Sequence, residues 1–147
     1  MRNTKIVAGL SLLTVVFGLG MAAGIGMDYV KAAPAESPRI YELRTYTTND
    51  GKLDDLHARF SNHTNRLFVK SGMTLIGYWT PADGDTADNT LVYLIAHEDA
   101  DGAKASWRAF GTDPDWQKAY ADSRKDGPLV KNITSQFLIP TDYSPLR

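Results

Sequence analysis

The chain of 147 residues contains no cysteine. It therefore has no disulfide framework and no thiolate nucleophile, and it cannot form a zinc site with cysteine ligands. Charge of one sign is not in excess either, because 16 Lys and Arg residues stand against 17 Asp and Glu residues. From residue 40 onward the balance is 12 basic against 15 acidic residues. A nucleic-acid-binding domain would show a basic stripe and a membrane-surface domain a polybasic patch, so the composition disfavours both classes.

A long hydrophobic run occurs at the start of the chain. Arg2 and Lys5 precede residues 6–27, which contain no charged residue. As a helix rising about 1.5 Å per residue, this segment is long enough for the ~30 Å hydrocarbon core of a bilayer. It is either a cleaved signal peptide with small residues before the cut, or an uncleaved membrane anchor, which the continuation of the run past Leu19 favours. Both interpretations predict export, because positive charge before the segment keeps the N-terminus in the cytoplasm. The protein would then be anchored in the cell membrane, periplasmic or extracellular.

The rest of the chain divides into three parts. Residues 28–39 hold alanines, two prolines and mixed charge without apolar periodicity, which is typical of a linker. Residues 40–140 form the predicted folded domain, and residues 141–147 a C-terminal tail.

The folded domain alternates between strand and helix patterns. Segments rich in β-forming residues predict strands at residues 40–47, 74–80, 90–97 and 132–140. Helical spacing of apolar residues predicts a helix over residues 53–70, and further helices between the third and fourth strands. The resulting βαββαβ order predicts an α+β, ferredoxin-like fold, an antiparallel sheet with helices on one face. Its bare sheet face would pair with a second copy, giving a homodimer that closes a dimeric α/β barrel.

The first strand, "IYELRTYT", places Glu42, Arg44 and Tyr46 on one face, because strand side chains alternate. If helices cover the opposite face, these three side chains point into the barrel. A charged pair there must be hydrogen-bonded or solvated, and Arg44 would suit a carboxylate or phosphate ligand. The three residues, together with Trp79, are the predicted ligand-binding residues. The alternative is a Glu42–Arg44 ion pair that fixes the dimer register and contacts no ligand.

His63 is the candidate catalytic residue. The series Leu53, Leu56, Phe60, His63 and Leu67 is spaced 3, 4, 3, 4, which places His63 on the apolar stripe of the first helix. With an unperturbed pKa near 6.5, a histidine beside a cavity can act as a general base. A hydrogen-bonded core histidine is the alternative.

Three stretches of the chain together resemble the NIPSNAP family. They are "IYELRTYT", "GKLDDLHARFSNHTNRLFVKSGMTLIGYWT" and "DPDWQKA", and the resemblance extends over residues 40–140. It implies a dimeric α+β barrel, in a superfamily that includes small monooxygenases and haem-degrading enzymes. A histidine at position 63 also belongs to the pattern. The resemblance implies no defined activity, and the mitochondrial roles of animal members do not transfer to a chain with an export-type N-terminus.

Two functions remain open. The first is an exported homodimeric module that binds a small apolar or acidic ligand in its barrel. The alternative is a small cofactor-free or haem-dependent monooxygenase-like enzyme, with His63 as base. No metal site is predicted, because His57 and His63 are six residues apart on one helix and point in different directions, and no cofactor motif is present. An open pocket that reaches His63 and Arg44 would favour the enzyme.

Overall fold

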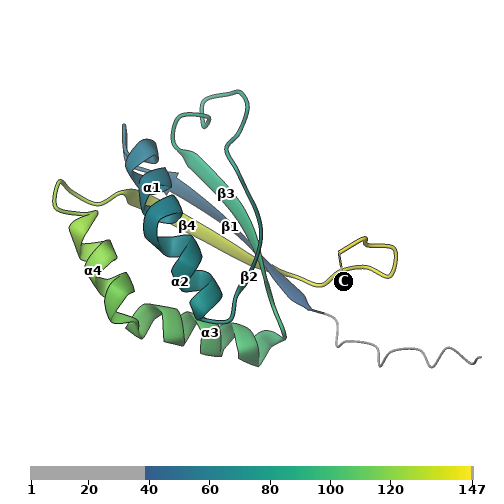
Figure 1. The fold of residues 1–147 in the computed structure, drawn as a ribbon. Coiled ribbons are helices and arrows are strands. Elements are labelled where there is room, and N and C mark those ends of the chain that lie inside the picture. Colours follow the sequence, from purple (N-terminus) through teal and green to yellow (C-terminus); the bar gives the residue numbers. More distant parts are fainter. Residues whose placement is uncertain (1–38, 147) are drawn as a thin grey trace, which may run out of the picture. The chain divides into compact units, whose positions relative to one another are not determined.

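The computed structural model describes residues 39–146 (Figure 1). The elements follow in the order β1 (Ile40–Thr48), α1 (Leu53–Arg59), η1 (Phe60–Thr64), α2 (Asn65–Lys70), β2 (Thr74–Trp79), β3 (Thr90–His97), α3 (Ala100–Thr112), α4 (Pro114–Asp122) and β4 (Val130–Leu138). The predicted signal peptide or anchor, and the linker up to residue 38, lie outside the described residues. Within residues 39–146, no helix has the length and apolar character needed to cross a bilayer.

The four strands form one antiparallel sheet in the order β2-β3-β1-β4. This is the ferredoxin-like strand order that the sequence predicts, and the helices lie along one side of it (Figure 1). β1 and β3 occupy the centre, and they pair in a register that places Arg44 opposite Tyr93 and Tyr46 opposite Leu91. The α+β fold is therefore confirmed for the described chain.

The helices cover the sheet face that carries Glu42, Arg44 and Tyr46. The buried side chains of β3 that face the helices are Leu91, Tyr93 and Ile95, and they lie opposite these three residues. The three side chains would point into a dimeric barrel only if the helices covered the opposite face. That expectation is wrong, because the three side chains point toward the helices. Alternation along a strand shows which side chains share a face. The face that the helices cover is decided by the larger aromatic and aliphatic surface of the neighbouring strand, which needs burial.

The first helix contains a π-helical turn, η1, between α1 and α2. The amide of Asn65 donates to the carbonyl of Phe60, and the hydroxyl of Thr64 donates to the carbonyl of Arg59 at 3.2 Å. Both bonds span five residues, so this turn holds one residue more than an α-helical turn would.

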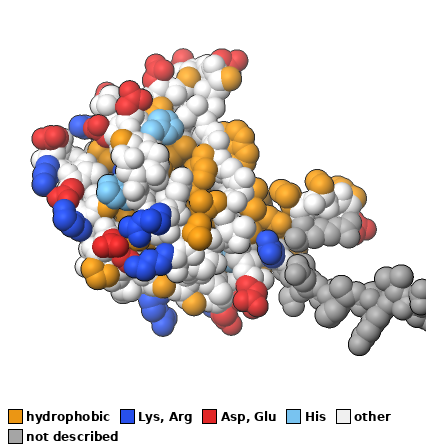
Figure 2. Space-filling view, viewed as in Figure 1, with side chains coloured by type: hydrophobic (Ala, Val, Ile, Leu, Met, Phe, Trp, Pro, Cys, Tyr) orange, Lys and Arg blue, Asp and Glu red, His pale blue; other side chains and the backbone are white. Residues whose placement is uncertain are grey.

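The extra residue rotates the chain and changes which side chain faces the core. Thr64 is 1% exposed and occupies the buried position, whereas His63 is exposed. Histidine side chains reach the surface on the helical side of the molecule (Figure 2). The prediction that His63 lies on the apolar stripe is therefore wrong, because it assumed 3.6 residues per turn throughout.

Two aspartates begin the later helices. Asp99 accepts from the Gly102 amide at 2.7 Å at the start of α3, and Asp113 accepts from the Asp115 amide at 2.8 Å at the start of α4. Asp113 also pairs with Lys70 at 2.7 Å. This pair joins the end of α2 to the start of α4.

Candidate functional site

Glu42 lies at the centre of a buried hydrogen-bond network. Arg44 Nη1 and Ser135 Oγ donate to its Oε1 at 2.7 and 2.6 Å. Trp107 Nε1 donates to its Oε2 at 2.6 Å, and His97 Nε2 lies 3.1 Å from the same oxygen. Glu42 is 2% exposed, so all its acceptor capacity is used within the protein. This carboxylate is structural and leaves no space for a ligand.

The network stabilises the ionised form of Glu42. Burial alone raises the pKa of Glu42, but the hydrogen bonds from His97, Ser135, Trp107 and Arg44 outweigh burial and lower the pKa to about 2. His97 has a buried side chain. Sequence analysis gave it no part in the site, because its partner is 55 positions away along the chain.

Arg44 is also held within the protein. Its guanidinium pairs with Glu42 and lies over the Trp107 ring, with Cζ 4.3 Å from the ring centroid. The predicted Glu42–Arg44 ion pair is therefore present, inside a single chain. The charge of the Arg44 guanidinium is thus already balanced by a carboxylate within the chain, although its buried Nε has no partner.

Trp79 lies on the other face of the sheet, which the helices leave open. It is 52% exposed and packs across Gly77, where a Cβ atom would lie 2.6 Å from the indole. The absence of a side chain at Gly77 therefore makes room for the indole ring. Leu75 does not share this face, because the register shifts between Leu75 and Gly77 and returns Leu75 to the core side.

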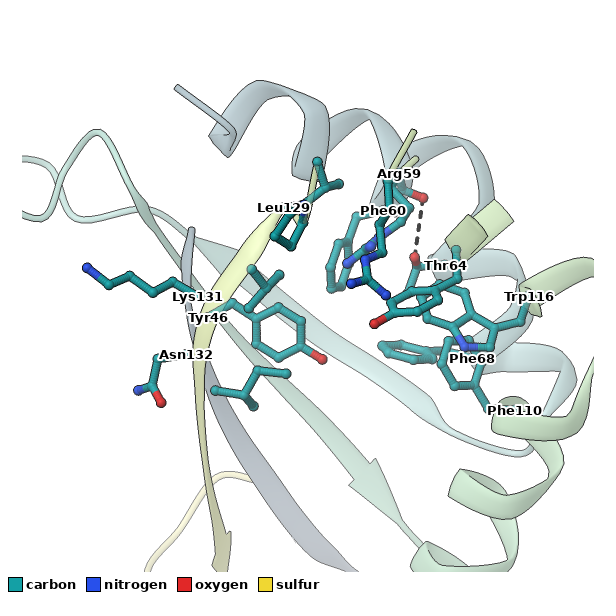
Figure 3. A pocket seen from close by; sticks show the side chains of 15 residues that line it. Tyr46, Arg59, Phe60, Thr64, Phe68, Phe110, Trp116, Leu129, Lys131 and Asn132 are labelled. Atoms are coloured by element: carbon teal, nitrogen blue, oxygen red, sulfur yellow. Dashed lines mark hydrogen bonds between the residues drawn. The ribbon is translucent and has the colours of Figure 1, made fainter. Parts of the chain in front are cut away.

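A cavity of about 430 Å³ lies between the helix-covered face of the sheet and the helices (Figure 3). Its aromatic lining comes from Tyr46, Phe60, Phe68, Phe110, Trp116 and Tyr120. Tyr46 projects into it from β1, and Arg59 enters from the helix on the opposite side (Figure 3). Of the predicted site residues, Tyr46 lines this cavity, while His63 borders a shallow outer hollow with Lys52 and Asp122.

Polar groups inside the cavity are few. The hydroxyls of Tyr46 and Tyr93 lie 3.1 Å apart, and with Tyr93 as donor the Tyr46 hydroxyl keeps its own proton for a further partner. Burial raises the pKa of Tyr93, so this group stays protonated at physiological pH. Burial lowers the pKa of Arg59, and the nearby charge of Arg124 acts in the same direction. A guanidinium nevertheless remains charged in a protein.

Sequence analysis did not identify Arg59. The signal was present, because Arg59 lies three residues after the buried Leu56 and next to the buried Phe60, on the edge of the apolar stripe. Long basic side chains at such edges usually extend to solvent, so the pattern alone predicts an exposed head group.

The sequence matches the NIPSNAP family over residues 41–145. The chain belongs to the NIPSNAP family. Solved structures of a similar fold include a NIPSNAP family protein from Agrobacterium tumefaciens strain C58, at 21% identity and a TM-score of 0.67, covering 78% of this chain and 96% of that one. A NIPSNAP-like domain protein from Burkholderia xenovorans is 22% identical with a TM-score of 0.65, covering 74% and 90% of the two chains.

A second NIPSNAP family protein from Agrobacterium tumefaciens, of unknown function, gives a TM-score of 0.66 at 21% identity and covers 76% of this chain and 96% of that one. No curated protein matches the sequence. At these identities the similarity establishes the fold of the NIPSNAP domain, and its activity has to be argued from the site.

The Glu42 network predicts a specific pH dependence of stability. Because the pKa of Glu42 falls from 4.5 to about 2 on folding, its contribution is complete above about pH 4.5 and disappears as the pH falls through 2. Glu42→Gln should lower the free energy of unfolding by about 3 kcal/mol at pH 7. Urea unfolding of both proteins should show this difference shrinking between pH 4.5 and 2.5. Glu98→Gln, at an exposed carboxylate, controls for the lost charge, and a difference that stays constant with pH would contradict the assignment.

Proposed function

We propose that this NIPSNAP domain is a small-molecule-binding module that works as a homodimer and holds its ligand between the sheet and the helices. The cavity lined by six aromatic side chains is the observation that supports binding. Its volume of about 430 Å³ lies in the range of small-ligand sites, which are typically apolar with a few polar groups at defined positions. The ligand position differs from the barrel interior expected from sequence.

The cavity is built around one predicted ligand-binding residue and one that the sequence did not indicate. Tyr46 offers a hydroxyl from the sheet and Arg59 a guanidinium from the helix. His63 lies outside it, so the proposed binding site contains no general base from the predicted set.

The open sheet face supports the homodimer. Register places Leu43, Leu94 and Val92 on this face of the central strands, with the exposed Trp79 on the edge strand β2. A second copy of the chain would remove this apolar surface from water, since two identical faces can pair about a twofold axis.

We further propose that the protein is exported, and that residues 1–27 either remain as a membrane anchor or are removed. The support is the uncharged run at residues 6–27 after Arg2 and Lys5.

Ligand binding can be tested with a neutral aromatic compound, 2-naphthol, in calorimetric titrations of the full-length protein. We expect binding that Ile133→Trp weakens at least tenfold, because the larger side chain would fill the cavity that Ile133 lines. Val69→Trp is the matched control, since Val69 is 58% exposed and does not line the cavity. Binding that is unaffected by Ile133→Trp, or no binding at all, would contradict the proposal.

Dimerisation can be measured by analytical ultracentrifugation at micromolar concentration. Leu94→Glu places a charge at the centre of the open sheet face, and it should convert the dimer to a monomer because burying an unpaired carboxylate is costly. Val69→Glu, on the helical side, should leave the dimer intact. A wild-type monomer would refute the homodimer.

Export can be followed with alkaline phosphatase fused after Arg39 in a bacterial host, since the enzyme needs disulfides that form outside the cytoplasm. The fusion should be active, and replacing Leu12 and Val16 with arginine should remove the activity at a cost of about 2.5–3.5 kcal/mol per charge in the segment. An inactive parent fusion would argue against export. The mass of the mature protein distinguishes the anchor from the cleaved peptide.

A further inference from the structure

We propose that the ligand of this cavity is an aromatic carboxylate, whose negative charge is received by Arg59. The inference rests on the proposed binding function and names its ligand class. Three observations support it: the sign of the charges that line the cavity, the lack of a carboxylate partner for Arg59, and the aromatic side chains that form the walls.

The charges of the cavity lining have one sign. Its charged residues are Arg59, Arg124 and Lys131, and no Asp or Glu lines it. This bias is notable in a chain in which acidic residues outnumber basic ones. Lys131 points away from the cavity (Figure 3), and Arg124 is exposed, so Arg59 supplies the positive charge inside.

Arg59 is buried without a carboxylate partner. It is 5% exposed, and it forms no ion pair with any residue in the described part of the chain. Its one hydrogen bond there runs from Nη1 to Ser123 Oγ at 3.3 Å, and its buried Nε has no partner. A guanidinium has five N–H donors, so most of its hydrogen-bonding capacity is unused. A buried charge without a partner is costly, and an anionic ligand would supply that partner.

Arg44 provides the internal comparison. Both arginines are largely buried and both lie over aromatic rings, Arg44 over Trp107 and Arg59 over Trp116 at 5.4 Å. Arg44 has the carboxylate of Glu42 at 2.7 Å, whereas Arg59 has none. The buried Nε of each guanidinium lacks a partner, so the two arginines differ in their charge balance. Glu42 neutralises Arg44, whereas no carboxylate among the described residues pairs with Arg59.

The walls define the rest of the ligand. Aromatic rings from the sheet, the π turn and α4 enclose the space next to Arg59, which suits a flat apolar body. Tyr46 can donate a second hydrogen bond from the sheet. One buried guanidinium offsets one negative charge, and its planar fork matches the two oxygens of a carboxylate. A dianionic phosphate would leave a charge unpaired at the same position.

The test compares 2-naphthoate with 2-naphthamide, which has the same shape without the charge. Calorimetric titration of the full-length protein, with protein-free detergent micelles subtracted, should show naphthoate binding about 10- to 100-fold more tightly than naphthamide. Arg59→Met should remove this preference by weakening naphthoate alone. Arg66→Met, at an exposed arginine outside the cavity, should leave both affinities unchanged.

The possible results separate the two proposals. Equal binding of the two compounds, both weakened by Ile133→Trp, would overturn the carboxylate inference while supporting the binding module. No binding of either compound, nor of 2-naphthol, would overturn both. A preference for naphthoate that survives Arg59→Met would overturn the role of Arg59. If Arg59→Met fails to fold, Arg59→Lys replaces it, because lysine keeps the charge without the planar fork. Arg59→Lys should bind naphthoate more weakly than the wild-type protein does, but more tightly than the wild-type protein binds naphthamide. The ratio of the naphthoate and naphthamide affinities of the wild-type protein remains decisive in either case.

Discussion

The Glu42 carboxylate accepts hydrogen bonds from side chains of four different elements. Arg44 lies on β1, His97 on β3, Ser135 on β4 and Trp107 on α3, so one side chain joins three strands to a helix. A buried carboxylate with any of these donors missing would carry an unmet desolvation cost, and this makes the arrangement cooperative. The distance between α3 and the sheet is thereby set at one end of the molecule.

At that end the layer between sheet and helices is filled, and away from it the layer is hollow. Trp107 and Arg44 occupy the space beside Glu42, whereas Tyr46 and the side chains of α4 line a cavity. The Lys70–Asp113 pair holds the start of α4 in place, and Trp116 and Tyr120 then form the wall of the cavity. The buried polar network and the aromatic cavity therefore occupy different parts of the layer between the sheet and the helices.

Much of this fold could be predicted from the sequence, and the error at His63 has a definite physical cause. The third strand was predicted with the observed bounds of Thr90–His97, and the first helix with its end at Lys70. Local signals are sufficient for these boundaries: β propensity indicates the strand, and Gly72 indicates the end of the helix. The error at His63 arose because one inserted residue in the π turn rotates everything after it, and β2 contains a comparable irregularity between Leu75 and Gly77. Such insertions are stabilised by tertiary packing, which cannot be read from the spacing of apolar residues along the sequence.

The candidate site was harder to predict for a related reason. The trio on β1 does share a face, but the two charged members satisfy each other, and only Tyr46 reaches the cavity. Arg59 differs from an ordinary surface arginine only in what surrounds it, namely residues from α4, from β4 and from the loop between them. No short stretch of sequence contains that information, since it depends on which residues surround the guanidinium in space.

The π turn has a consequence for how this helix can change length. Removing one residue from an α-helix normally turns all later side chains by about 100° and exposes the core. Here the helix already carries one residue in surplus, so loss of the exposed Asn62 would restore regular winding, with Phe60, Leu67 and Phe68 still directed inward. The deletion would change the part of the cavity lining that Thr64 and Arg59 form, because the hydrogen bond between these two residues spans the five residues of the π turn. Single-residue length variation at this point would therefore reshape the cavity while leaving the scaffold intact.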